Sequence, residues 1–287
     1  MPELPEVETL CRQLNTVLPG ERILRIEVLD PRLENTGQRG EGSAILFPGS
    51  LPDGSGPGKI AGLVGRRVAA VTRRGKSIHI QMDGGLTAAL HLRMSGRLLY
   101  RTADVPRSSD FFPYSRLVIG FSSGTLVLID PRRFATFALQ PEGINPALPD
   151  DPIAGLPARR LEEIARTRRR PVKSFLMDQK LIAGIGNIYA CEILFAAGID
   201  PRRPACSLKK AEWRKVAKTA AAILQRAVAF RGTTLSDWRD LFGCSGTNQD
   251  HLDVYSRQGA PCRRCGGIIE RISQGGRGTW LCPVCQK

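Results

Sequence analysis

Four cysteines near the end of the chain have the spacing of a zinc site. They form two pairs, Cys262-x2-Cys265 and Cys282-x2-Cys285. Two such pairs supply the four thiolates of a tetrahedral zinc site. Because four protein ligands leave no position for water or substrate, the ion is expected to be structural. The sequence therefore predicts one bound Zn²⁺ without a catalytic role.

A glycine turn at residues 184–186 comes directly before Asn187 and a helix expected to run to about Ala197. The first N–H groups of a helix have no partner inside it, and the helix dipole is positive at this end. The turn is therefore suited to a phosphate. A run of basic residues precedes it: Arg166, Arg168, Arg169, Arg170 and Lys173. Such a run is more often only a solvated face, but its position favours DNA contact, with Arg168 and Lys173 the best candidates.

The composition is strongly basic, with 42 Lys and Arg against 27 Asp and Glu and a net charge of +15. A charge of this size favours an anionic partner, and nucleic acid is the leading candidate. No apolar run approaches the ~18 residues of a membrane span, and the first ten residues hold no secretion signal. We therefore expect a cytoplasmic protein with no membrane partner, whose cysteines are thiols or metal ligands and not disulfides.

The first half of the chain predicts a helix followed by short strands. Apolar residues fall on one helical face from Val7 to Leu18, and Pro19-Gly20 ends the pattern. From Arg22 the apolar period becomes two, which is typical of half-buried strands. Further short runs, separated by turns, lie at residues 78–82, 86–92, 117–121, 125–129 and 134–139. This pattern favours a β-sandwich or a barrel.

The second half predicts helices and a terminal ribbon, giving an α+β fold. Residues 34–58 are rich in Gly, Pro and Ser and are expected to form a mobile loop. A proline-rich stretch at 141–157 predicts a linker. Apolar spacing predicts a long helix over about 208–230. The expected domains are residues 1–140, 158–255 and, for the zinc ribbon, 256–287.

Several motifs together resemble the formamidopyrimidine-DNA glycosylase family, in family order along the whole chain. The helix opening at Pro2 and Glu3 would be ordinary if it stood alone. The motifs are MPELPEVETL at the start, RRGK at 73–76, HLRMSGRL at 91–98, DPRRF at 130–134, LMDQKLIAGIGNIYACEILFAAGI at 176–199, and the cysteine pairs. The resemblance implies a β-sandwich domain with an N-terminal helix, then a helical helix-two-turn-helix domain with a zinc ribbon.

The resemblance also implies the chemistry. In the family, the amine of Pro2, exposed once Met1 is removed, attacks the sugar carbon that bears the damaged base. An α-amine has a reference pKa of about 7.7 to 8.0, and a nearby cation such as Lys76 favours its neutral form. Glu3 would exchange protons at the sugar, with Glu6 helping to hold the site. Lys76 would be a proton donor during elimination, and Arg277 in the ribbon would help the second elimination.

The implied partner is double-stranded DNA that contains oxidised bases or abasic sites, bound by a monomer. The damaged nucleotide must be extruded from the duplex, which leaves a gap. The resemblance implies that Met94, Arg132 and Phe134 fill it. Without it, Met94 and Phe134 would more often be core residues. Asn187 is expected at a phosphate, and Tyr114 at a further DNA contact.

Three departures from the family pattern limit what carries over. The stretch at 34–58 is longer than expected. Where many relatives have His-x-His or His-x-Arg, this chain has Tyr114-Ser115-Arg116, which puts that DNA contact in doubt. Gly246-Thr247-Asn248 replaces a Gly-Tyr-Phe that relatives often carry, so base preference is open. Two alternatives stay open: an endonuclease VIII type of enzyme for oxidised pyrimidines, and a zinc-ribbon DNA-binding protein without catalysis.

Overall fold

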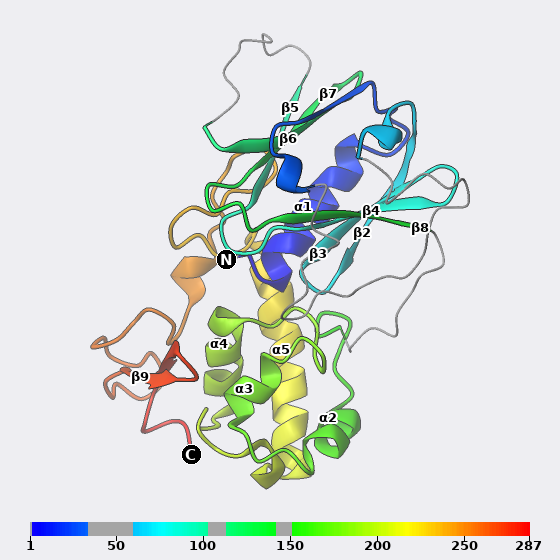
Figure 1. The fold of residues 1–287 in the computed structure, drawn as a ribbon. Helices are drawn as coiled ribbons and strands as arrows, with labels where there is room; N and C mark the ends of the chain where they lie inside the picture. The colour runs from blue at the N-terminus through cyan, green and yellow to red at the C-terminus, as the bar shows by residue number, and fades with distance from the viewer. Residues whose placement is uncertain (1, 34–59, 103–112, 142–150) are drawn as a thin grey trace. The chain divides into compact units, whose positions relative to one another are not determined.

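The computed structural model describes residues 2–33, 60–102, 113–141 and 151–287 (Figure 1). The predicted loop at 34–58 lies outside these residues. The chain packs as two compact units, each described by itself. The first unit comprises Met1–Pro2, Glu6–Ala147 and Thr234–Gly246, and the second comprises Glu3–Pro5, Leu148–Thr233 and Thr247–Lys287.

Two antiparallel four-stranded sheets build the first unit. One sheet has the order β1 (Arg25–Val28), β6 (Ser115–Gly120), β7 (Gly124–Ile129), β5 (Arg97–Thr102). The other has the order β2 (Val68–Arg74), β3 (Ser77–Met82), β4 (Leu86–His91), β8 (Thr136–Pro141). Short 3₁₀ helices lie at η1 (Pro31–Leu33) and η2 (Ile60–Leu63). Apolar residues of both sheets share one core, as a sandwich requires.

The N-terminal helix α1 (Leu4–Val17) contributes its apolar face to this core. Val7, Leu10 and Leu14 are all buried, as their helical spacing predicts. Figure 1 shows α1 beside β2 and β3. Leu24, expected in a half-buried strand, is 55% exposed and precedes β1. The predicted α+β fold with a β-sandwich and an N-terminal helix is confirmed.

Residues 234–246 return to the first unit, although their place in the sequence suggests the C-terminal domain. Trp238 and Leu241 are buried in the sandwich core. The backbone N–H of Tyr100 donates to the carbonyl of Leu241 at 2.8 Å, and Gln13 on α1 donates to Asp240 at 3.0 Å. The packing of the first unit is therefore discontinuous in sequence, while the predicted domain limits stay a prediction.

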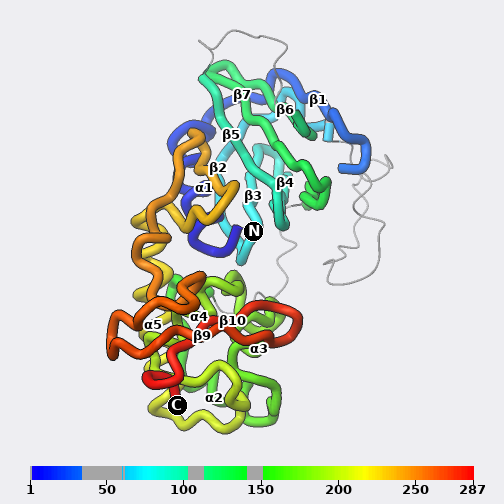
Figure 2. The backbone as a smooth tube through the Cα atoms, turned by 90° about the vertical axis from the view of Figure 1, so that its left-hand side faces the viewer, coloured from blue at the N-terminus to red at the C-terminus, as the bar shows by residue number. Residues whose placement is uncertain are grey.

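Helices dominate the second unit, with a small hairpin at its end (Figure 2). The helices are α2 (Ala158–Ala165), α3 (Val172–Leu176), α4 (Asn187–Ala197), α5 (Lys210–Ala229), and the 3₁₀ turns η3 (Ala205–Ser207) and η4 (Asn248–His251). The hairpin pairs β9 (Glu270–Gln274) with β10 (Arg277–Leu281), and β10 packs against α4. The predicted helices at 187–197 and about 208–230 are confirmed. Among the described helices, none combines the length and apolar character needed to cross a bilayer.

Candidate functional site

The Glu3 carboxylate lies at the start of α4 and accepts hydrogen bonds from the backbone. The N–H groups of Gly186 and Ile188 donate to it at 2.9 and 3.0 Å, and that of Tyr189 at 3.4 Å. Glu3 is 2% exposed. The carboxylate thus satisfies N–H groups that have no partner within the helix, at the positive end of its dipole. The expectation that these N–H groups are free for a phosphate is wrong, because Glu3 occupies them.

The two glycines before α4 make room for the N-terminal segment. A methyl group at Gly186 would overlap the carboxylate of Glu3. At Gly184, whose φ is +96°, a Cβ would lie 2.6 Å from Leu4 Cδ1. Leu4 also donates its backbone N–H to the carbonyl of Gly184 at 3.1 Å. The motif therefore fixes the residues that follow Pro2 in the chain, a role that its glycine spacing alone did not indicate.

Pro2, Glu6 and Lys76 belong to the first unit. Pro2 and Glu6 are buried, and Lys76 is half-buried in the turn between β2 and β3. The motif that carries Lys76 also carries Arg73, which is bound to Glu8 of α1 at 2.8 Å. This ion pair attaches the hairpin with Lys76 to the helix with Glu6. Neither partner was expected from the sequence to have this role.

Burial and nearby charges shift the pKa values of Glu8 on α1 and His91 on β4. Burial tends to raise the pKa of Glu8, but hydrogen bonds from Arg73 and Arg12 outweigh it, so the pKa lies below its ordinary value. Burial, with the charges of Arg93 and Lys76, lowers the pKa of His91 to about 4. His91 is therefore neutral near pH 7 and adds no positive charge to those of Arg93 and Lys76.

Lys173 and Asn187 converge on one carbonyl in β10. Lys173 Nζ donates to Gly278 O at 3.1 Å and to Thr279 Oγ1 at 2.7 Å, and Asn187 Nδ2 donates to Gly278 O at 3.0 Å. Arg277, the exposed residue before Gly278, begins this strand. The two side chains thus hold the strand that presents Arg277. Burial lowers the pKa of Lys173, and the charge of Arg277 adds to this effect while that of Glu3 opposes it.

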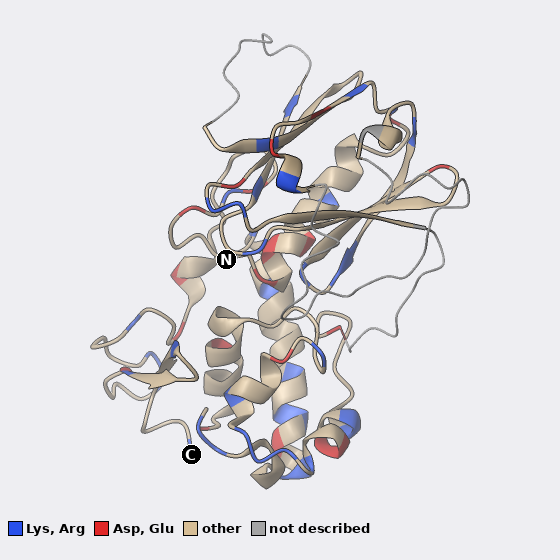
Figure 3. Cartoon of the chain, viewed as in Figure 1, with Lys and Arg blue, Asp and Glu red and all other residues tan. Residues whose placement is uncertain are grey.

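The structure places Lys173 differently from an exposed phosphate ligand. Its side chain is 2% exposed, and its ammonium already donates to two acceptors. Arg168 is exposed, after the end of α2. Figure 3 shows further basic residues on α2 and along α5, where Lys210, Arg214, Lys215 and Lys218 are exposed. Direct DNA contacts by Arg168 and Lys173 remain predictions.

Four residues expected at DNA are exposed together in the first unit. Met94 is 51% exposed, Tyr114 62% and Phe134 55%, and Arg132 is also exposed. Arg132 Nη1 lies 3.9 Å from the Met94 sulfur, so the β4–β5 and β7–β8 connections meet. Met94 and Phe134 are not core residues, in contrast to what their residue types alone suggest.

The four terminal cysteines form a zinc site in the second unit. Their Sγ atoms all lie within 4.8 Å of one another, and two of the separations are 3.5 and 3.9 Å. A tetrahedron with Zn–S bonds of about 2.3 Å requires sulfur separations of about 3.8 Å. The four thiolates therefore fit one structural zinc ion, as predicted. Cys262 and Cys282 pack with Phe195 of α4, which attaches the ribbon to the helical core.

Comparisons with known proteins agree with this arrangement. Family models for the formamidopyrimidine-DNA glycosylase N-terminal domain and H2TH domain match residues 1–137 and 150–238, and a zinc finger found in FPG and IleRS matches 259–287. Formamidopyrimidine-DNA glycosylase of Moorella thermoacetica is 39% identical over 95% of this chain and 94% of its own. That of Roseiflexus sp. is 39% identical over all of both chains.

Solved structures show the same fold. The Lactococcus lactis Fpg bound to DNA with an abasic site has a TM-score of 0.85 and 30% identity, with 99% of both chains covered. A MutM complex with DNA containing carbocyclic 8-oxo-G has a TM-score of 0.84 and 31% identity, with both chains covered in full. Since the relatives exceed 30% identity over nearly the whole chain, this protein belongs to the formamidopyrimidine-DNA glycosylase family.

Proposed function

We propose that this protein is a bifunctional DNA glycosylase and AP lyase that excises oxidised purines from duplex DNA. The substrates are 8-oxoguanine and formamidopyrimidines, and the partner is double-stranded DNA with such bases or with abasic sites. The observation that carries the proposal is the fixed carboxylate of Glu3, held by three backbone N–H groups. It is next in the chain to Pro2, so a nucleophile and a proton-transfer group are adjacent.

Removal of Met1 frees the secondary amine of Pro2. Its nitrogen forms a bond to C1′ of the sugar, and the bond from C1′ to the damaged base breaks, the base leaving with the electron pair and gaining a proton. Glu3 exchanges protons at the sugar, whose ring opens to give a Schiff base with Pro2. Glu6, buried on the first turn of α1, helps to hold this region.

The Schiff base then serves as an electron sink for strand cleavage. Loss of a proton from C2′ expels the 3′ phosphate, and a second elimination expels the 5′ phosphate. Lys76 is the proton donor in the first step, and Arg277 assists the second. Lys76 lies in the β2–β3 turn, and Arg277 is the first residue of β10, next to the β9–β10 turn.

DNA contacts are assigned to the exposed groups of both units. Met94, Arg132 and Phe134 fill the gap left by the extruded nucleotide, with Tyr114 beside them. Arg168 contacts a phosphate. Lys173 and Asn187 belong to the DNA-binding region of the second unit. Both donate to the carbonyl of Gly278 and thereby position Arg277.

A preference for oxidised pyrimidines is the second candidate. One solved relative, the Lactococcus lactis enzyme at 30% identity and a TM-score of 0.84, is a complex with DNA containing an oxidised pyrimidine. This chain has Gly246-Thr247-Asn248 where relatives often carry Gly-Tyr-Phe, which leaves its base preference open. Both lesion classes therefore belong in the test.

The test is single-turnover kinetics with Glu3→Gln on duplexes carrying 8-oxoguanine, an oxidised pyrimidine or a ready-made abasic site. Base excision should fall by about 10² to 10⁴, since general acid–base help is lost. Cleavage at the abasic site should persist, because no base has to leave. Glu163→Gln, at an exposed position on α2, is the matched control. Equal loss on all substrates, or no loss of excision, would contradict the assignment of Glu3.

A further inference from the structure

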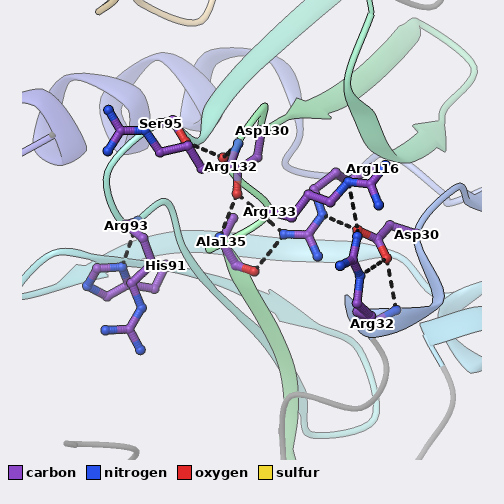
Figure 4. A network of polar contacts seen from close by, with 10 residues as sticks. All are labelled: Asp30, Arg32, His91, Arg93, Ser95, Arg116, Asp130, Arg132, Arg133 and Ala135. Atoms are coloured by element: carbon purple, nitrogen blue, oxygen red, sulfur yellow. Dashed lines mark hydrogen bonds and ion pairs between the residues drawn. The ribbon is translucent and has the colours of Figure 1, made fainter.

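A buried network of charges in the first unit binds Arg132, one of the four exposed residues assigned to DNA (Figure 4). Asp130 and Arg116 are 0% and 2% exposed. Neither contributes to the chemistry described above. The family motif includes Asp130, whereas Arg116 stands in the Tyr114-Ser115-Arg116 segment, in which Tyr114 was the residue expected at DNA. Because Arg116 is fully buried, it does not present its guanidinium to DNA.

Asp130 connects the segments that carry the exposed residues. Its carboxylate accepts hydrogen bonds from Ser95 Oγ at 2.5 Å and from the backbone N–H of Ala135 at 2.7 Å. Its own backbone N–H donates to the carbonyl of Tyr114 at 3.0 Å. Ser95 follows Met94, and Ala135 follows Phe134. One aspartate therefore contacts the neighbours of Met94 and Phe134, and Tyr114 itself.

Arg116 completes the network from β6. Its guanidinium donates to Asp130 at 3.4 Å, to Asp30 at 3.0 Å and to the carbonyl of Ala135 at 3.0 Å. Burial tends to raise the pKa of Asp30, but hydrogen bonds from Arg32 and the charge of Arg116 outweigh it and lower the pKa. The guanidinium thus forms an ion pair with each of the two carboxylates in the interior.

The exposed residues also depend on unusual backbone conformations. Arg93, Tyr114 and Arg133 have φ values of 54°, 76° and 59°, in the left-handed region that non-glycine residues seldom adopt. Arg93 precedes Met94, and Arg133 precedes Phe134. Such conformations persist when surrounding contacts hold them. The buried network supplies such contacts on each of the three segments.

We propose that Arg116 is a positioning residue that holds Met94, Tyr114, Arg132 and Phe134 in the arrangement needed to replace an extruded nucleotide. The proposal rests on the proposed function of these residues in gap filling. Without the guanidinium, Asp30 and Asp130 would both lose the ion pair that Arg116 makes with each of them. The three segments would then relax together, because all of them bind to this network.

A double-substitution cycle tests this proposal. Arg116→Met and Phe134→Ala are made singly and together, and Arg25→Gln, on the neighbouring strand β1 in an exposed pair with Glu27, is the control. Single-turnover excision is measured on a lesion duplex with 2-aminopurine beside the lesion, whose fluorescence reports disruption of the stack. Borohydride trapping on a single-stranded abasic oligonucleotide, which needs no gap filling, is measured in parallel.

We expect Arg116→Met to lower excision and the fluorescence change by about 10- to 100-fold, as a misplaced group can. Trapping on single-stranded DNA should be unchanged. In the Arg116→Met protein, Phe134→Ala should lower excision and the fluorescence change only slightly further. The effects of substitutions in residues that act as a unit are not additive. Equal factors for Phe134→Ala in both backgrounds would overturn the proposal.

Two further results keep the proposal and the proposed function separable. If Arg116→Met does not fold, Ser95→Ala replaces it, since that change removes one bond to Asp130 without leaving a buried charge. Met94→Ala must then be non-additive with Ser95→Ala for the proposal to stand. If the unaltered protein neither excises nor traps, the proposed function fails, and the fluorescence cycle alone decides whether Arg116 positions the inserted residues.

Discussion

Glu3 and the exposed residues around Arg116 are held by different kinds of groups. In the second unit, Glu3 is bound by backbone N–H groups that a glycine turn and a helix provide. In the first unit, the exposed side chains depend on the side-chain charges of Arg116 and Asp130. Main-chain support survives most substitutions but fails where added atoms displace it. Side-chain support fails when a single charge is removed.

The largest effect is expected from loss of zinc, because the zinc ribbon contains β10 and therefore Arg277. Cys282→Ser should lose the ion and unfold the ribbon, since structural zinc sites contribute roughly 10 to 16 kcal/mol. Gly278 would then leave Lys173 and Asn187, and Arg277 would lose its position. Zinc content and strand cleavage are measured, with the exposed Cys206→Ser as control. Stoichiometric zinc and full strand cleavage in Cys282→Ser would contradict this account.

The second-largest effect is expected from a substitution that disturbs the backbone hydrogen bonds to Glu3. In Gly186→Ala, the new methyl group overlaps the Glu3 carboxylate, so excision should fall by about 100-fold. Gly62→Ala is the control, because a Cβ there meets no atom within 4 Å. Single-turnover rates on a lesion duplex provide the measurement. Equal rates for the two variants would show that Glu3 does not depend on this close approach.

A smaller effect should appear as pH dependence of the first unit. Burial, with the charge of Arg74, lowers the pKa of His79 from 6.5 to about 4. The unfolded chain therefore binds a proton that the folded chain does not, and stability is lost as pH falls from 6.5 toward 4. The loss from this residue approaches about 3 kcal/mol below pH 4. Urea unfolding across this range should show a shallower dependence in His79→Gln; an identical dependence would remove His79 as a cause.

The smallest effect concerns the exposed basic residues of the second unit. Arg168→Ala should reduce the slope of log affinity against log salt by about 1, as expected for one phosphate contact. Arg159→Ala is the control, because Arg159 is already paired with Glu163 at 3.0 Å. Binding to undamaged duplex is titrated at several salt concentrations. An unchanged slope for Arg168→Ala would move the phosphate contact elsewhere.

Regular spacing made much of the fold predictable. The apolar period gave α1 and α5, the glycine turn gave the start of α4, and the cysteine pairs gave the zinc site. Strands β2 and β5 were both missed. A register shift between Val68 and Ala70 interrupts the alternation of β2, whereas β5 pairs with β7 without a shift. An irregular register therefore explains only the first omission.

Contacts between distant residues were the part that the sequence could not predict. The hydrogen bond from Gly186 to Glu3 links residues that are 183 positions apart in the sequence. The bond from Arg116 to Asp30 links residues that are 86 positions apart. In the segment containing Arg116, only Tyr114 was expected at DNA, and the sequence does not show that the guanidinium of Arg116 is buried. Charge pattern identifies a basic residue but not its partner.

Identification of the nucleophile tests the central claim most directly. The protein is incubated with duplex containing 8-oxoguanine opposite cytosine, reduced with borohydride, digested and mapped by mass spectrometry. We expect the adduct on the peptide that begins with Pro2, formed only by protein that lacks Met1. Pro2→Gly should retain some trapping, because it keeps an exposed α-amine. If a chain with an acylated N-terminus excises the base and is trapped at the normal rate, the nucleophile lies elsewhere and the claim is wrong.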